Sequence, residues 1–281
     1  MNSSGAAAGL GLISAATWGG SDFVGGLGAR RAPALMVVAS GHIFSLLLML
    51  ALCLGIHLAL PGSHYLFYAA LGGFEGSIAL AVFYRALAMG AMGLTAALTG
   101  LLTALIPVLF SLFHDGLPTP LTAAGLAMGL IAIWLITRSP AVRDATTPPA
   151  ALLLGALAGI GFGAQLILFK FASPGGILWT MTSARAAGSV AMILVLLIMP
   201  PKEKWRGFWL AGIAAGTLDT VGNLFYLRAT QIGRLDVAAL VCSLYPAGTI
   251  LLAALVLREW PSRRQFAGIA LALAAVVLLS V

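Results

Sequence analysis

The chain has 281 residues, of which 61% are apolar and only 8% are charged. Soluble domains carry about 25% charged residues, so this composition excludes a protein that faces water on all sides and indicates one embedded in lipid. The formal net charge of +7 is attributed to membrane orientation rather than to nucleic-acid binding. No basic residue precedes the first apolar run, so we expect no cleaved signal peptide.

Ten apolar segments follow one another along the chain, separated by charges, prolines and glycine clusters. A membrane-spanning helix needs about 20 predominantly apolar residues, and each segment approaches or exceeds that length. We expect helices at 6–28, 34–58, 65–88, 93–113, 121–137, 150–171, 177–199, 208–229, 237–257 and 265–279. The sequence therefore predicts an all-α polytopic membrane protein with ten transmembrane helices and no water-soluble domain.

Basic residues are distributed unevenly between the nine expected loops. Eleven Lys and Arg residues lie in or beside the odd-numbered loops, whereas the even-numbered loops hold three: Lys170, Arg228 and Arg234. Cytoplasmic loops of membrane proteins are enriched in Lys and Arg. We therefore expect the odd-numbered loops to face the cytoplasm and both termini to lie on the non-cytoplasmic side of a bacterial plasma (inner) membrane.

The sequence contains two weakly similar halves. At a shift of 144 residues, GLISAATWGG (residues 11–20) aligns with GALAGIGFGA (155–164), and at 143 FYRALAMG (83–90) aligns with YLRATQIG (226–233). This predicts a first five-helix repeat at 1–140, a linker at 141–149 and a second repeat at 150–281. Since five is odd, the second repeat must be inverted, which is typical of secondary transporters with a substrate site near the midplane.

Several motifs resemble the drug/metabolite transporter superfamily in its ten-helix EamA-type branch. They are TWGGSDFVG in the first segment, SARAAGSV around Arg185, and DVAALVCSLYPAGTILLAALVLREWPS, which contains Pro246 and Glu259. The first half departs from the pattern, with Asp115 where a glutamate is usual and Pro107 displaced by four residues. Within this branch the chain is most similar to YddG-type amino-acid exporters, and that resemblance implies export of small metabolites.

Four ionisable residues fall inside the expected spans: Asp22, Glu75, Arg185 and Asp219. Such residues are costly in lipid, and each is a functional-site hypothesis. Asp22 has two interpretations, either an interfacial carboxylate paired with Arg30 or Arg31, or a cavity-lining group beside a bent, glycine-containing stretch. Arg185 and Glu75 could equally form a structural pair.

The helical spacing of Asp219, Asn223 and Tyr226 places them on one face of a helix. We expect one central cavity between the two halves. Its predicted substrate-binding residues are Trp18, Glu75, Tyr84, Asp219, Asn223 and Tyr226. Structural or gating roles are expected for Gly19, Gly20, Asp22, Arg185 and Pro246, and His42 is expected to be packed and hydrogen-bonded.

The sequence contains no metalloprotease, nucleophile-elbow or phosphate-loop motif, so we expect no enzymatic activity, no cofactor and no metal. The function it predicts is export of amino acids, including aromatic and other neutral ones, by alternating access. The alternative is proton-coupled efflux of lipophilic cations or drugs, for which Glu75 is the candidate proton-binding residue. The expected partners are a small-molecule substrate and the lipid bilayer, without nucleic acid, and the chain is expected to be a monomer.

Overall fold

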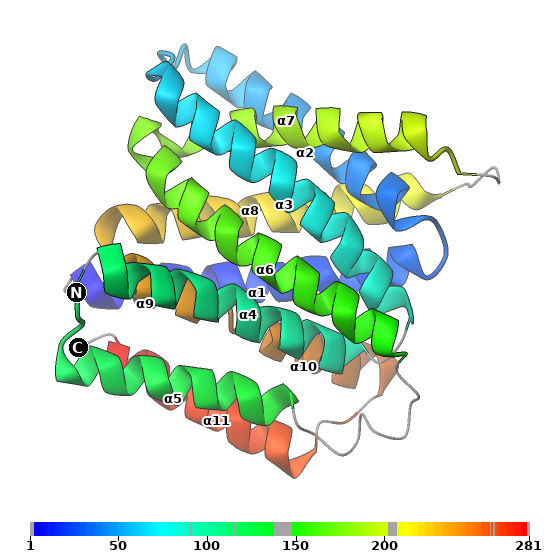
Figure 1. Cartoon of the computed structure of the whole chain (residues 1–281). Helices are drawn as coiled ribbons and strands as arrows, with labels where there is room; N and C mark the ends of the chain where they lie inside the picture. The colour runs from blue at the N-terminus through cyan, green and yellow to red at the C-terminus, as the bar shows by residue number, and fades with distance from the viewer. Residues whose placement is uncertain are drawn as a thin grey trace.

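A computed structural model describes residues 3–89, 92–114, 116–137, 148–201, 207–258, 260 and 262–279, and within these ranges every regular element is helical (Figure 1). The first half contains α1 (Ser3–Ala29), α2 (Ala34–Gly55), α3 (Ser63–Met89), α4 (Met92–His114) and α5 (Pro120–Thr137). The second half contains α6 (Pro149–Ala172), the 3-10 turn η2 (Ser173–Gly175), α7 (Ile177–Ile198), α8 (Phe208–Ile232), α9 (Leu235–Cys242), α10 (Tyr245–Leu257) and α11 (Arg263–Leu279). Asp115, Glu259 and most of the expected linker lie outside the described residues.

Nine of the ten expected segments coincide with a single helix, with ends that agree within three residues. The ninth expected helix, 237–257, is wrong as a continuous element because the chain breaks at Ser243 and Leu244, between α9 and α10. The physical reason is Pro246, which has no N–H to donate to the carbonyl of Cys242 and whose ring crowds that carbonyl. The break brings Tyr245, the first residue of α10, to the centre of the molecule.

Five segments of the described chain are long and apolar enough to cross a membrane. They are α2, α3, α6 with η2, α7, and α9 together with α10. Large apolar side chains are exposed on the outside of the bundle, among them Leu47, Leu197 and Leu255, as expected where the solvent is lipid. The helix composition therefore identifies a multi-pass membrane protein. Figure 1 shows both ends of the chain at the same end of the bundle.

Helices of the first half pack mainly against helices of the second half. The most extensive contacts are those of α1 with α8 and of α3 with α6, and α2 packs against both α7 and α8. On the outer side, α5 and α11 lie side by side (Figure 1). The interior of the bundle is thus built from α1, α3, α6 and α8, flanked by α4 and by the α9–α10 pair.

Small residues allow the close crossings in this interior. A Cβ atom on Gly41 of α2 would lie 2.6 Å from the carbonyl oxygen of Gly212 on α8, and one on Gly216 would lie 2.5 Å from the Cα of Gly41. Glycine at such crossings lets helix backbones approach closely, and the resulting van der Waals packing is one of the forces that drive helix association in lipid. This backbone contact fixes α8 against α2. It thereby sets the direction in which Asp219 and Asn223 of α8 point.

Candidate functional site

A pocket at the centre of the bundle is lined by six helices, three from each half. Its volume of about 30 Å³ is room for about two water molecules, which is too small for a metabolite-sized substrate. A metabolite-sized substrate enters only when the helices move apart. The lining residues are Trp18 and Asp22 of α1, Leu80 of α3, Thr103 of α4, Phe162, Gln165 and Leu166 of α6, Asp219 and Asn223 of α8, and Tyr245 of α10.

Helical spacing explains how α1 and α8 supply most of the polar lining. Trp18 and Asp22 are four residues apart on α1, as are Asp219 and Asn223 on α8, so each pair shares one helix face. Gly222 makes room for the indole, because a Cβ atom there would lie 2.5 Å from Cδ1 of Trp18. Neither α1 nor α8 is among the five helical segments that are long and apolar enough to cross a membrane, and both carry polar groups of this pocket.

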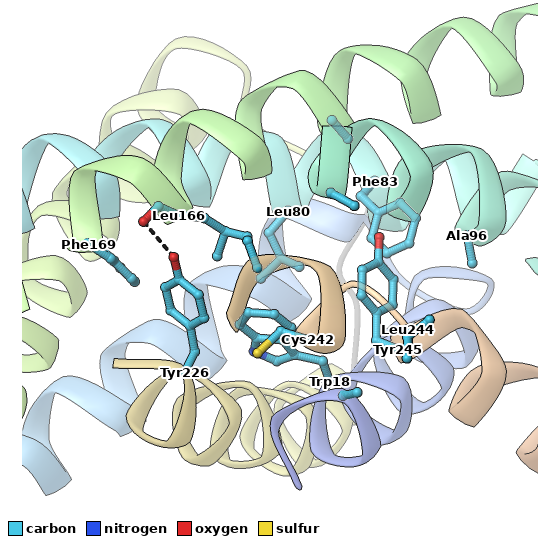
Figure 2. Packing of buried hydrophobic residues seen from close by; sticks show 14 of the residues in the cluster. Trp18, Leu80, Phe83, Ala96, Leu166, Phe169, Tyr226, Cys242, Leu244 and Tyr245 are labelled. Atoms are coloured by element: carbon cyan, nitrogen blue, oxygen red, sulfur yellow. Dashed lines mark hydrogen bonds between the residues drawn. The ribbon is translucent and has the colours of Figure 1, made fainter. Parts of the chain in front are cut away.

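Aromatic rings surround Trp18. Its ring centroid lies 5.9 Å from that of Tyr226 and 6.3 Å from that of Tyr245, which it meets edge to face. Figure 2 shows Trp18 between these two tyrosines, with Leu80 and Leu166 beside it. Tyr226 is held by its hydroxyl, which donates to the carbonyl of Leu166 at 2.7 Å. The indole is therefore fixed by packing, and its Nε1–H is buried without a hydrogen-bond partner among the described residues.

An ion pair joins α7 and α8 at the edge of the pocket. Nη2 of Arg185 bonds Oδ2 of Asp219, and Nη1 lies 2.9 Å from Nδ1 of His42 on α2. The side chains of Arg185 and Asp219 are only 4% and 15% exposed. Arg185, His42 and Tyr84 line a second, smaller cavity of about 10 Å³, and Asp219 lines both cavities. Asp219 therefore forms part of the wall between them.

Asp22 is a buried residue, 6% exposed, and lines the central pocket with its carboxyl group. In the ranges that the structure describes, Asp22 makes neither an ion pair nor a hydrogen bond through this group. The expected alternative of a pair with Arg30 or Arg31 is wrong, because both arginines are exposed beyond the end of α1 and neither pairs with Asp22. The suggested pair of Arg185 with Glu75 is likewise replaced by the pair with Asp219.

The structure brings together only part of the expected binding set. Trp18, Asp219 and Asn223 line the central pocket, whereas Glu75, Tyr84 and Tyr226 are not among its lining residues. Tyr84 is buried with its hydroxyl 3.0 Å from Oγ of Ser21. Glu75 lies at the interface of α3 with α6, against Gly161, and its Oε2 is buried without a hydrogen-bond partner among the described residues.

The residues expected to have structural or gating roles lie around the pocket. A Cβ atom on Gly19 would lie 2.7 Å from the carbonyl oxygen of Tyr245 and 2.9 Å from Cα of Gly248, so α1 touches the backbone of α10 there. Gly20 faces Leu218 of α8, and Pro246 packs against Gly100 of α4. Two of these contacts connect the first half of the chain to the α9–α10 region.

Several lining residues were not in the expected binding set, among them Phe162, Gln165 and Thr103. The internal repeat carried a usable signal for Phe162, because the 144-residue shift aligns it with Trp18. No comparable signal marks Thr103 or Gln165, since their roles depend on how α4 and α6 are rotated. Within the described ranges, no three or more His, Cys, Asp or Glu residues are grouped so that they could hold a metal ion.

The fold and the pocket define a multi-pass helical membrane protein with a small pocket lined by polar and aromatic side chains from both halves of the chain. Residues 149–281, which span α6 to α11, match the model of the EamA-like transporter family. This match implies small-molecule transport across a membrane and a non-enzymatic protein. It agrees with the family resemblance of the motifs in the sequence.

The fold also has relatives among solved structures, of which 25 chains match. One of them, described only as "Crystal structure of protein", is similar over 99% of this chain and 96% of its own, with a TM-score of 0.74 and 19% sequence identity. At that identity the similarity concerns the fold alone. No curated protein matches the chain by sequence.

Proposed function

We propose that this chain is a secondary transporter that exports small metabolites bearing an amino group, in particular amino acids, across a bacterial plasma membrane. The observation that carries the proposal is the central pocket, because one small site receives side chains from six helices of both halves. Secondary transporters bind their substrates near the midplane at the interface of two repeats. The resemblance to YddG-type amino-acid exporters supports the choice of substrate.

We further propose that residues 1–140 and 150–281 are two inverted five-helix repeats joined by 141–149. The pairing of helices supports this, since α1 packs on α8 as α6 packs on α3. The close crossings correspond as well. Gly41 of α2 meets Gly216 of α8, and Ala184 of α7 meets Gly73 of α3; a shift of 143 residues relates Gly41 to Ala184 and Gly73 to Gly216.

A second pair of contacts beside the pocket follows the same relationship. Gly19 of α1 packs against Thr249 of α10, and Gly163 of α6 packs against Ile106 of α4. The shift is 144 residues from Gly19 to Gly163 and 143 residues from Ile106 to Thr249. Equivalent contacts in the two halves favour equivalent movements, which is what alternating access requires of a pair of gates.

The small size of the central pocket supports a mechanism in which α4 and the α9–α10 pair act as the two gates. Thr99 of α4 donates from Oγ1 to the carbonyl of Gly155 on α6 at 2.8 Å. In the other half, Gly11 of α1 packs against Val241 and Cys242 of α9. Separation of one gate from its partner helix would open the pocket to one side of the membrane, while the other gate keeps the opposite side closed.

Transport by purified protein in proteoliposomes tests this proposal. Vesicles preloaded with an unlabelled amino acid should accumulate the labelled amino acid by exchange, in a panel that includes aromatic and other neutral amino acids. A parallel series with an imposed pH gradient distinguishes amino-acid exchange from proton-coupled efflux of lipophilic cations. Uptake no greater than that of protein-free vesicles across the whole panel would contradict the proposed function.

A further inference from the structure

We infer that the central pocket is a site for small organic amines in their monocationic form, with Asp22 as the carboxylate that receives the ammonium group. Amino acids, which carry a carboxylate as well, are then the weaker ligands of the same site. The inference rests on the proposed function, because it concerns which of the amine-bearing metabolites the transporter prefers.

The balance of charge at the pocket is the first reason. Asp22 and Asp219 are the charged residues of the lining, and no Lys or Arg is among the lining residues. Arg185 neutralises Asp219 through their ion pair, so Asp22 remains as the carboxyl group of the lining that has no counter-charge. The ionised form of Asp22 is costly in this buried position unless a counter-charge is supplied. A monocation supplies it, whereas a zwitterion adds a second carboxylate that needs a cation of its own.

Arg185 cannot serve as that cation in this arrangement. Its two terminal nitrogens are engaged by Asp219 and His42, and it lines the smaller cavity rather than the central pocket. The nearby Lys170 of α6 donates from Nζ to the carbonyl of Thr230 and is not a lining residue. Glu75, at the α3–α6 interface, would add negative charge to the surroundings and not positive charge.

Asn223 offers the pocket a hydrogen-bond acceptor for a ligand that donates hydrogen bonds. Asn223 donates from Nδ2 to the carbonyl of Asp219 at 2.8 Å, so its amide nitrogen is engaged within α8. Asn223 is only 3% exposed. Its Oδ1, a hydrogen-bond acceptor, has no partner in the described parts of the chain. Asp22 and Asn223 together present carboxylate and amide oxygens to the pocket, which match the three N–H donors of an ammonium group.

Aromatic rings complete the match to a cation. Trp18, Phe162 and Tyr245 line the same pocket as Asp22, and aromatic faces attract ammonium groups, most strongly the face of Trp. A carboxylate gains nothing from such faces and would rely on neutral donors such as Nε1–H of Trp18. The chemistry of the lining thus favours an apolar or aromatic body with one ammonium group.

Three ligands that share one phenyl ring test the inference: phenethylamine (a cation), phenylalanine (a zwitterion) and 3-phenylpropanoate (an anion). Their competition against a labelled amine or amino acid is measured in proteoliposomes at one fixed pH. The wild-type protein should bind phenethylamine at least about tenfold more tightly than phenylalanine, and the anion weakest, since a hydrogen-bonded charge pair is worth at least about one decade in affinity.

Asp22→Asn removes the charge with little change of shape and should reduce the preference for the amine to about threefold or less, whereas Asp22→Glu should retain most of it. Thermal unfolding in detergent verifies that each variant is folded, and the wild-type comparison does not depend on either variant. Phenylalanine binding as tightly as phenethylamine, or a preference unchanged in a folded Asp22→Asn protein, overturns the inference and leaves the proposed function intact. Absence of transport for amines and amino acids alike overturns both.

Discussion

Arg185 on α7 and Asp219 on α8 form an ion pair at the wall between the central pocket and the smaller cavity, and His42 on α2 binds the other terminal nitrogen of the guanidinium group. Three helices from both halves of the chain thus meet at one buried cation. The pair satisfies Asp219 and leaves Asp22 as the free carboxylate of the pocket. The ion pair therefore contributes to the stability of the bundle and to the electrostatic potential in the pocket.

Removal of one partner of this ion pair should be more damaging than removal of both. Arg185→Met leaves Asp219 buried without a counter-charge, and we expect a loss of about 3–5 kcal/mol in the free energy of unfolding. Arg185→Met combined with Asp219→Leu should recover part of that loss. Unfolding of the single and double variants in detergent gives the coupling as a double-mutant cycle. A double variant whose loss equals the sum of the losses of the two single variants would show that the two residues act independently.

Neutralisation of the two candidate carboxylates should affect transport unequally. Asp219→Asn leaves the charge of Arg185 unpaired beside the pocket, and we expect a loss of about 1.5–3 kcal/mol in substrate binding, the value of one hydrogen bond to a charged group, which is roughly ten- to hundredfold in apparent affinity. Glu75→Gln changes a group at the α3–α6 interface and should change apparent affinity less. KM values in proteoliposomes, with folding checked separately, provide the comparison. A larger effect of Glu75→Gln would place the substrate path at the α3–α6 interface.

Gly19 and Gly9 of α1 offer a matched pair of substitutions. Gly19→Ala forces a Cβ atom against the backbone of Tyr245 and Gly248, and we expect a loss of about 1–3 kcal/mol from overpacking. Gly9→Ala meets no heavy atom within 4 Å and should be neutral or stabilising by up to about 1 kcal/mol, because alanine favours the helix. Thermal unfolding of the two variants measures both effects. Equal stability of the two variants would show that the contact of Gly19 with α10 accommodates an added methyl group without loss of stability.

The uneven distribution of basic residues predicts the orientation of the chain. Alkaline phosphatase fused to the C-terminus should be active, because that end is expected on the non-cytoplasmic side. Green fluorescent protein inserted in the loop between α7 and α8 should fluoresce, because that loop is expected in the cytoplasm. Alkaline phosphatase and green fluorescent protein fusions report the two sides with opposite signals. A fluorescent C-terminal fusion would reverse the orientation proposed here.

The sequence determined the positions of nearly all helices and the class of protein. A span in lipid depends on local composition and length, which each segment contains within itself. For that reason nine helices could be placed within three residues. The sequence also marked Asp22, Arg185 and Asp219 as unusual, because an ionisable residue inside an apolar run is visible without knowledge of its neighbours.

The tertiary structure decided which of these residues meet. Arg185 could be paired in sequence with either Glu75 or Asp219, and only the packing of α7 against α2 and α8 selects Asp219. The spacing of residues along one helix fixes which side chains share a face, but not the direction in which that face points. That direction is set by close contacts between helices, such as Gly41 with Gly216, and these contacts join residues far apart in the chain.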